Sequence, residues 1–276
     1  MRLTTRQIFW DPPHQQTPRI WAEQFRLHTT GFSATATRST MGANLNGTGK
    51  WHSGAPGIDG KIYGIPFDAT DILIIDPIAG TAVRSTMGVD LSGTSKWVGG
   101  VVGIDGKIYG IPYDATDILI IDPVAGTAVR STMGADLSGG IKWQGGVSGI
   151  DSNIYGIPRN STDILIIDPI AGTAVRSTMG ANLSGTSKWV GGVVGIDGKI
   201  YGVPRNSTDI LIIDPVAGTA TRSTMGADLS GTNKWVSGVP GIDGKIYCIP
   251  LDTIDILQIT VGSNTPLRLA MQSSFF

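Results

Sequence analysis

Residues 96–133, KWVGGVVGIDGKIYGIPYDATDILIIDPVAGTAVRSTM, return with small changes every 46 residues from Lys50 onward. The copies begin near residues 50, 96, 142, 188 and 234. Each copy keeps one tryptophan in the same place, at Trp51, Trp97, Trp143, Trp189 and Trp235. A fixed period of about 20 to 50 residues is typical of repeat domains, in which neighbouring copies bury each other's faces. The sequence therefore predicts one repeat domain made of five units.

Each unit contains four segments with the composition of β-strands. In the second copy, residues 96–103 are the first predicted strand, Asp105-Gly106 is a tight hairpin turn and residues 107–111 are the second strand. Residues 118–121 form a short apolar run, which predicts a strand covered on both faces. Residues 127–133 alternate apolar and polar side chains, as a half-exposed strand does. We expect each unit to be a four-stranded antiparallel meander.

Four short strands in a 46-residue unit are typical of a β-propeller blade. A third strand that is apolar on both faces fits blades stacked face to face. A β-solenoid is the alternative, but its rungs are shorter and the two halves of this unit do not resemble each other. The sequence favours an all-β fold, a five-bladed β-propeller of 46-residue four-stranded antiparallel blades.

A further copy of the fourth strand precedes the first unit, at residues 35–42. Residues 265–271 have the same register after the fifth unit, but Pro266 lacks a backbone N–H for the sheet. We therefore predict that residues 35–42 complete the blade of residues 234–262, so that the ring is closed by an N-terminal strand. The predicted organisation is an irregular N-terminal extension over residues 1–33, the propeller over residues 34–272 and a tail over residues 273–276.

The repeated motifs resemble those of the β-propeller repeat families of the NHL, YVTN and kelch kind. The likeness covers residues 35–272 and depends on DGKIY at 105–109 and IIDP at 120–123, with their copies. In those families a DG hairpin precedes a K-I-Y strand and then an I-I-D strand, so the resemblance implies a propeller fold. Five such blades are also similar in size to the tachylectin type of lectin propeller. That family's sugar-site motifs are absent, so the resemblance transfers no site residue.

The charge balance argues against nucleic acid and membrane partners. The net charge is −1 and the sequence pI is near 6.3, whereas phosphate backbones and anionic lipids need clustered Lys and Arg. No apolar run is long enough for a membrane span or a secretory signal. We expect a soluble, monomeric, cytoplasmic protein, with a transit peptide over residues 1–33 as an alternative. The single cysteine, Cys248, excludes an intramolecular disulfide and is expected to be buried and unreactive.

The sequence gives little support for catalysis. The only glutamate is Glu23, outside the repeat, and the three histidines, His14, His28 and His52, lack the spacing of a metal site. Nucleophile and phosphate-binding motifs are also missing. The aspartates that repeat before and after the third strand are expected to accept hydrogen bonds from backbone N–H groups. We expect no catalytic residue, no metal and no cofactor.

The repeated tryptophans and tyrosines are interpreted as packing between blades, with five sugar-stacking platforms as the alternative. The copies differ mainly in two loops, one between the second and third strands and one from the fourth strand into the next unit. Alternate loops of a meander emerge at the same end, so these loops share a face. Variation there is typical of a binding surface, although exposed loops also drift without selection. The candidate binding residues are Phe67, Asp68, Tyr113, Asp114, Arg159, Asn160, Arg205, Asn206, Leu251 and Asp252.

These patterns favour a non-enzymatic propeller that presents this face multivalently to a glycan or a protein partner. A second hypothesis is an enzyme with a site at the central channel, for which His52 and Gln144 are polar departures in the first strand. A third is a structural repeat array with no specialised ligand. The near-identity of the copies opposes the enzyme, because an active site normally breaks such symmetry.

Overall fold

The computed structural model describes residues 35–262. The chain divides into two compact units, residues 1–39 and residues 40–276. Only residues 35–39 of the first unit are described, and they form neither helix nor strand. The described part of the second unit is all β, and it includes no helix long and apolar enough to cross a membrane.

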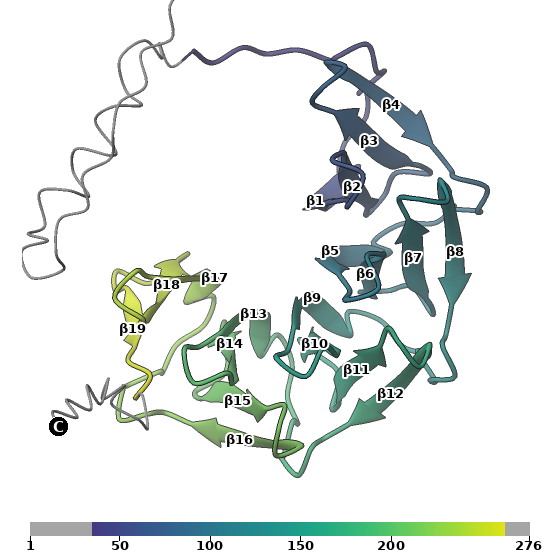
Figure 1. Cartoon of the computed structure of the whole chain (residues 1–276). Helices are drawn as coiled ribbons and strands as arrows, with labels where there is room; N and C mark the ends of the chain where they lie inside the picture. Colours follow the sequence, from purple (N-terminus) through teal and green to yellow (C-terminus); the bar gives the residue numbers. More distant parts are fainter. Residues whose placement is uncertain (1–34, 263–276) are drawn as a thin grey trace, which may run out of the picture. The chain divides into compact units, whose positions relative to one another are not determined.

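The second unit contains five antiparallel sheets, one for each sequence repeat, which we name blades 1 to 5 in chain order (Figure 1). Blade 1 contains β1 (Trp51–Pro56), β2 (Ile62–Pro66), β3 (Ile72–Asp76) and β4 (Thr81–Ser85). Blade 2 contains β5 (Trp97–Val102), β6 (Ile108–Pro112), β7 (Ile118–Asp122) and β8 (Thr127–Ser131). Blade 3 contains β9 (Trp143–Ser148), β10 (Ile154–Pro158), β11 (Ile164–Asp168) and β12 (Thr173–Ser177). Blade 4 contains β13 (Trp189–Val194), β14 (Ile200–Pro204), β15 (Ile210–Asp214) and β16 (Thr219–Ser223). Blade 5 contains β17 (Trp235–Pro240), β18 (Ile246–Pro250) and β19 (Leu257–Ile259).

The predicted five-bladed propeller of antiparallel meanders is confirmed, because the strands in every sheet pair in chain order. Local side-chain contacts explain the turns. The Asp105 carboxylate accepts a hydrogen bond from the Lys107 backbone N–H (3.2 Å), and Gly106 has a φ of 80° that favours glycine. After β7, the Asp122 carboxylate accepts hydrogen bonds from the N–H groups of the next turn, as predicted for this aspartate.

The first strands of the blades lie along the inside of the array (Figure 1). A pair of glycines near the middle of β5 and β9 allows these strands to approach closely. Gly99 has a φ of 96°, and a Cβ atom added there would lie 2.8 Å from the Cα of Gly145. The interpretation of these glycines as sites of close backbone approach is therefore confirmed.

The core lies between blades, because each cluster of buried apolar side chains combines residues from two neighbours. Trp97, Trp143 and Trp189 are fully buried. The indole N–H of Trp97 donates to the backbone carbonyl of Asp117 (2.8 Å). This burial supports packing and opposes the alternative that the tryptophans are sugar-stacking platforms.

A buried lysine joins each pair of adjacent blades, and we name this arrangement the lysine clamp. Lys188 of blade 4 donates from Nζ to the carbonyls of Arg159 (3.0 Å) and Ser161 (2.9 Å) in blade 3 and of Gly185 in its own loop (2.8 Å). Burial lowers the pKa of Lys188 to about 8, so the group is charged at neutral pH. The clamp recurs at Lys96, Lys142 and Lys234.

The predicted closure of the ring is not formed in the described structure. Blade 5 has three described strands, and β19 pairs there only with β18. Residues 35–40 form no strand, although Met41 has a positive φ like its copies and its carbonyl accepts a hydrogen bond from the Ala82 N–H (2.7 Å). In blades 1 to 4 a short turn brings the fourth strand back onto the third. Residues 35–42 and β19 are more than 200 residues apart in the chain, so their pairing requires a long-range closure with a larger entropy cost.

The alternative fourth strand at residues 265–271 lies outside the described residues, as do most of the predicted N-terminal extension and the tail. The buried position predicted for the cysteine is confirmed, since Cys248 is fully buried and burial raises the pKa of its thiol to about 12.

Candidate binding surface

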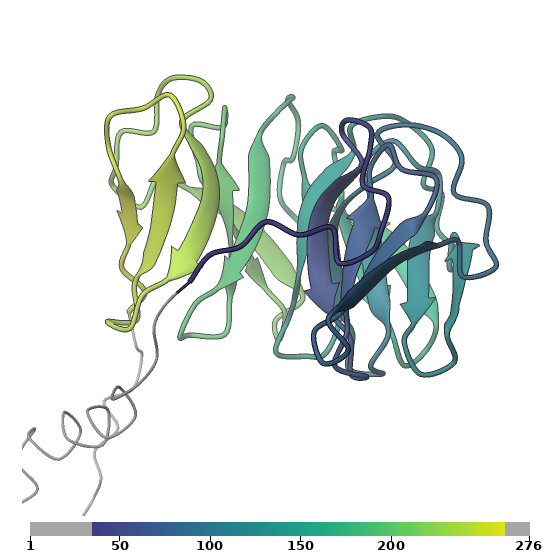
Figure 2. The ribbon, with the colours of Figure 1, turned by 90° about the horizontal axis from the view of Figure 1, so that it is seen from above.

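The two variable loop families share one face, as predicted. We name them the BC loops, between the second and third strands, and the DA loops, which lead into the next blade. Figure 2 shows the loops gathered at the two ends of the strands. The Asp68 carboxylate in the BC loop of blade 1 accepts a hydrogen bond from the Ser95 N–H in the following DA loop (2.7 Å). The same bond joins Asp114 to Ile141, Asn160 to Ser187 and Asn206 to Asn233.

These bonds give four of the candidate residues a structural partner. The DA-loop residue that donates the hydrogen bond has a positive φ in each case, 51° at Ser95 and 48° at Ser187. The Asp or Asn side chain satisfies the N–H of this unusual backbone and links consecutive blades. Asp68, Asp114, Asn160 and Asn206 therefore hold the loop face in shape.

Three other candidates form a continuous row across blades 1 to 3. The rings of Phe67 and Tyr113 meet edge to face, with centroids 5.9 Å apart. The guanidinium of Arg159 lies 5.5 Å from the centroid of Tyr113, and its Nη1 donates to the Gln144 amide oxygen. The His52 ring extends the row on the other side, 5.4 Å from Phe67. We name His52, Phe67, Tyr113 and Arg159 the aromatic strip.

The aromatic strip places ring surfaces that are tilted to one another beside a cation. Phe67, Tyr113 and Arg159 are half-buried, and His52 is exposed. The Nε of Arg159 is buried and has no hydrogen-bond partner among the described residues. Such a surface suits a ligand with an apolar face next to a hydrogen-bond acceptor.

The structure does not bring the last candidates into the aromatic strip. Arg205 donates from Nε to the Asn233 side chain (3.1 Å), which directs the guanidinium toward the DA loop that leads into blade 5. Leu251 and Asp252 are exposed in the BC loop of blade 5. Of the predicted multivalent loop face, three blades contribute to the aromatic strip.

The aspartates before the third strand have a different partner from the predicted one. Asp117 accepts hydrogen bonds from Arg130 on β8, with an Nη2–Oδ2 distance of 2.8 Å. The same guanidinium lies 5.4 Å from the Trp97 centroid and donates to the Asp90 carbonyl (3.1 Å). The prediction of backbone capping is wrong for this aspartate, because the fourth strand places an arginine opposite it. Blades 1, 3 and 4 repeat the pairing with Arg84, Arg176 and Arg222.

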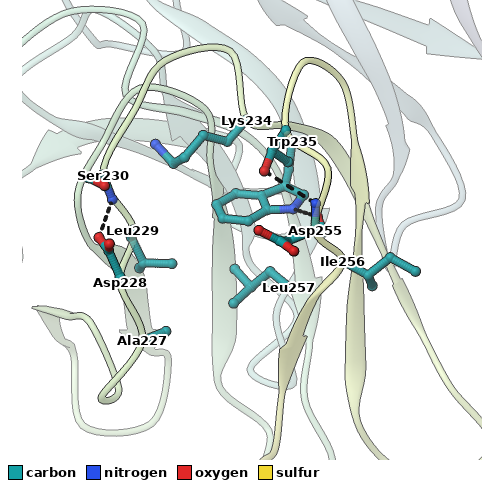
Figure 3. Close-up of a pocket in the computed structure, with 10 residues that line it drawn as sticks. Ala227, Asp228, Leu229, Ser230, Lys234, Trp235, Asp255, Ile256 and Leu257 are labelled. Carbon is teal, nitrogen blue, oxygen red and sulfur yellow. Dashed lines mark hydrogen bonds between the residues drawn. The ribbon is translucent and has the colours of Figure 1, made fainter.

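In blade 5 the corresponding place is a cavity of about 290 Å³ (Figure 3). Trp235 and Asp255 line one side, and the indole N–H donates to the Asp255 carbonyl (2.9 Å). Asp228 and Ser230 line another part and are joined by a hydrogen bond of 2.9 Å. No described residue places an arginine between them. This cavity was not predicted, because Asp255 is the copy of aspartates that pair with an arginine in blades 1 to 4.

The opposite loop face carries exposed aliphatic side chains that were not predicted. Ile104 in a hairpin turn is 64% exposed, and Val124 in the turn after β7 is 76% exposed. Part of this pattern is packing, since a Cβ atom at Gly106 would lie 2.7 Å from Ile58 of the preceding blade. Within residues 35–262, no three His, Cys, Asp or Glu side chains gather as a metal site would require.

No family model matches the sequence, and no curated protein matches it. The fold is similar to solved propeller structures. A catalytically inactive variant of virginiamycin B lyase from Staphylococcus aureus, with quinupristin, has a TM-score of 0.58 and 16% identity, over 80% of this chain and 74% of that one. A streptogramin B lyase has a TM-score of 0.56 and 13% identity, over 72% and 62%. An auxiliary nutrient binding protein from Bacteroides ovatus has a TM-score of 0.50 and 15% identity, over 72% and 56%. At these identities the likeness shows the fold alone.

Proposed function

We propose that this chain is a non-enzymatic binding propeller that presents the BC and DA loop face to a glycan or a protein partner. The aromatic strip is the main support. It combines two ring surfaces and a guanidinium on loops that vary between copies, while the blades beneath them hardly change. Variable loops on a rigid scaffold are the usual location of binding residues.

The ligand chemistry follows from the residues of the strip. Phe67 and Tyr113 offer flat apolar area with few rotatable bonds, so ordering them costs little entropy. Arg159 is held by Gln144 and by the Tyr113 ring, so its position is set before a ligand binds. We expect a ligand group with a flat apolar face beside a carboxylate or carbonyl oxygen. An acidic sugar and an acidic, aromatic peptide segment both have this combination.

The names of the similar structures include both lyases and a nutrient binding protein. The enzyme hypothesis requires a catalytic group at the central channel, and the polar departures in the first strand are His52 and Gln144. The amide oxygen of Gln144 accepts a hydrogen bond from Arg159 of the aromatic strip. The imidazole of His52 lies instead against Phe67, at the end of the aromatic strip. This position favours a contact role for His52 in binding.

The proposal is tested by a glycan array and by pull-down from a lysate, followed by titration of each hit against variants. We expect Tyr113→Ala and Arg159→Ala each to weaken binding by at least about tenfold, which corresponds to about 1.4 kcal/mol. Val124→Ser on the opposite face is the matched control and should bind as wild type does. The proposal is contradicted if each hit binds wild type and every aromatic-strip variant with the same affinity. Turnover of a bound ligand that His52→Ala abolishes would favour the enzyme hypothesis.

A further inference from the structure

The two ends of the blade array present opposite halves of one repeated apolar interface. Between blades 3 and 4, Ile157 on one side and Ile200 on the other are both fully buried. Their copies at the ends are exposed, Ile249 of blade 5 by 43% and Ile62 of blade 1 by 40%. We name the side of blade 5 that contains Ile249 the trailing face, and the side of blade 1 that contains Ile62 the leading face.

The polar contacts of the repeated interface are divided between the same two ends. Lys50 is the blade 1 copy of the clamp lysine, and among the described residues its Nζ donates only to the Gly47 carbonyl of its own loop (2.6 Å). Leu251 and Thr253 are the blade 5 copies of the two residues whose carbonyls accept from Lys188. Asp252 is the copy of Asn160, which accepts from the following DA loop. Each end therefore has the groups that the other end needs.

The four formed interfaces keep the two end faces apart within one chain. The lysine clamp and the bond from the BC loop to the DA loop recur at every interface, so the step from one blade to the next is fixed. With these steps, β1 and β17 lie apart (Figure 1). Closing the array on itself would distort all four interfaces at once, whereas a second chain can cover an end face without distorting any.

We propose that the trailing face of blade 5 binds the leading face of blade 1 of a second copy of this chain. The contact is heterologous, because the two surfaces that meet are different. Lys50 of the second copy donates to the carbonyls of Leu251 and Thr253, and Ile62 of the second copy packs on Ile249. These are the contacts of the blade 3 to blade 4 interface, formed between chains.

The N-terminal segment of the second copy also has a place in this docking. Arg38 precedes Lys50 by 12 residues, the spacing that separates Arg130 from Lys142. Residues 35–42 of the second copy are then in register to add a fourth strand to β19, with Arg38 in the place that Arg130 occupies in blade 2. Residues 35–42 are then still the fourth strand of blade 5, as predicted, but they come from another chain by β-strand addition.

The experiment uses two full-length variants, Ile62→Asp and Ile249→Asp, whose masses are measured by light scattering after size exclusion. Wild type at about 1 to 100 µM should rise above the 28.9 kDa of one chain as concentration increases. Each variant alone has lost one face and should stay at one chain. An equimolar mixture should form a species of two chains, because the intact trailing face of one variant meets the intact leading face of the other.

Val124→Asp, on the opposite loop face, is the control and should associate as wild type does. Lys50→Met is a milder variant that keeps the fold and should weaken association at least about tenfold, by loss of two hydrogen bonds to carbonyls. Circular dichroism checks that every variant is folded. Wild type that stays at one chain at every concentration, or a mixture that gives no two-chain species, overturns the proposal.

Discussion

The interface between blades 3 and 4 and the trailing face of blade 5 have almost the same sequence and opposite environments. Ile157 is fully buried, whereas Ile249, two repeats later, is 43% exposed. The main difference is that blade 3 has a following blade, whereas no blade follows blade 5 among the described residues. The repeated sequence therefore specifies the contact between blades as well as the sheet of each blade. The apolar positions of a blade are buried only where a neighbouring blade covers them.

The comparison also predicts where the array is weakest. Among the described residues, blade 5 has three strands and no following blade covers its trailing face. Burying one Ile side chain stabilises a fold by about 1.5 to 3 kcal/mol. We expect local opening to begin at blade 5, which hydrogen exchange would detect as its lowest protection.

The largest expected effect is on the apolar contacts. Ile157→Ala should lower the free energy of unfolding by about 2 to 5 kcal/mol, because it leaves a cavity between two blades. Ile249→Ala removes the same atoms from an exposed place and should cost less than about 1 kcal/mol. Urea unfolding at a concentration where the chain is a monomer measures both. Equal costs would contradict the difference between interior and end.

The lysine clamp should give the next effect. Lys188→Met removes an ammonium that donates to three carbonyls, so buried acceptors lose their partner and the free energy of unfolding should fall by about 2 to 3 kcal/mol. Lys50→Met removes a group with a single described carbonyl partner and should change stability little. Thermal unfolding of the two variants beside wild type distinguishes them. A cost at Lys50 as large as at Lys188 would show that the end face is covered.

A smaller effect is expected for the side chains that link BC loops to DA loops. Asn160→Ala leaves the Ser187 N–H without its acceptor and should cost about 1 kcal/mol. Asp252→Ala removes the equivalent side chain in blade 5, where the described residues include no following DA loop, and stability should stay at the wild-type value. Chemical unfolding curves give both values. A large loss for Asp252→Ala would mean that its carboxylate has a partner.

Much of the fold follows from the sequence, because propeller blades are built from local meanders. The strand positions, the DG hairpin and the Asp-Pro turn are fixed by short-range chemistry that is visible at Asp105 and Asp122. The clamp was not predicted, since Lys96 meets carbonyls of residues 27 and 29 positions earlier in the chain. The closure by residues 35–42 stays a prediction, because these residues and β19 are far apart in the chain and no short-range contact specifies their pairing.

The candidate surface was predicted only in part. Variation between copies identified Phe67, Tyr113 and Arg159, and the structure places them in one row. Variation between copies could not separate ligand-facing residues from those that hold loops together, such as Asp68, because both kinds lie in the same variable loops. Their binding role stays a prediction.

The smallest expected effect concerns the tyrosines of the hairpin turns, Tyr201 in blade 4 and Tyr247 in blade 5. Each hydroxyl donates to an aspartate four residues earlier, Asp197 (2.8 Å) or Asp243 (2.7 Å). At neutral pH, Tyr201→Phe should cost about 1 kcal/mol or less, because one hydrogen bond is lost and the ring still packs. Tyr247→Phe should cost no more.

The pH dependence of unfolding separates the two tyrosines. Burial, followed by the hydrogen bond to Asp197, raises the pKa of Tyr201 well above its usual value. The unfolded chain therefore releases this proton near pH 10 while the folded chain keeps it, so stability is constant below pH 10 and falls as the pH rises above it. Tyr201→Phe should make this alkaline loss of stability shallower.

For Tyr247 the hydrogen bond to Asp243 is the main cause of the raised pKa, and burial adds less. Tyr247→Phe should therefore leave a steeper alkaline loss of stability than Tyr201→Phe does. Urea unfolding at intervals from pH 8 to pH 11 measures both slopes, and identical slopes would mean that the interior of the array protects its tyrosines no better than its end does.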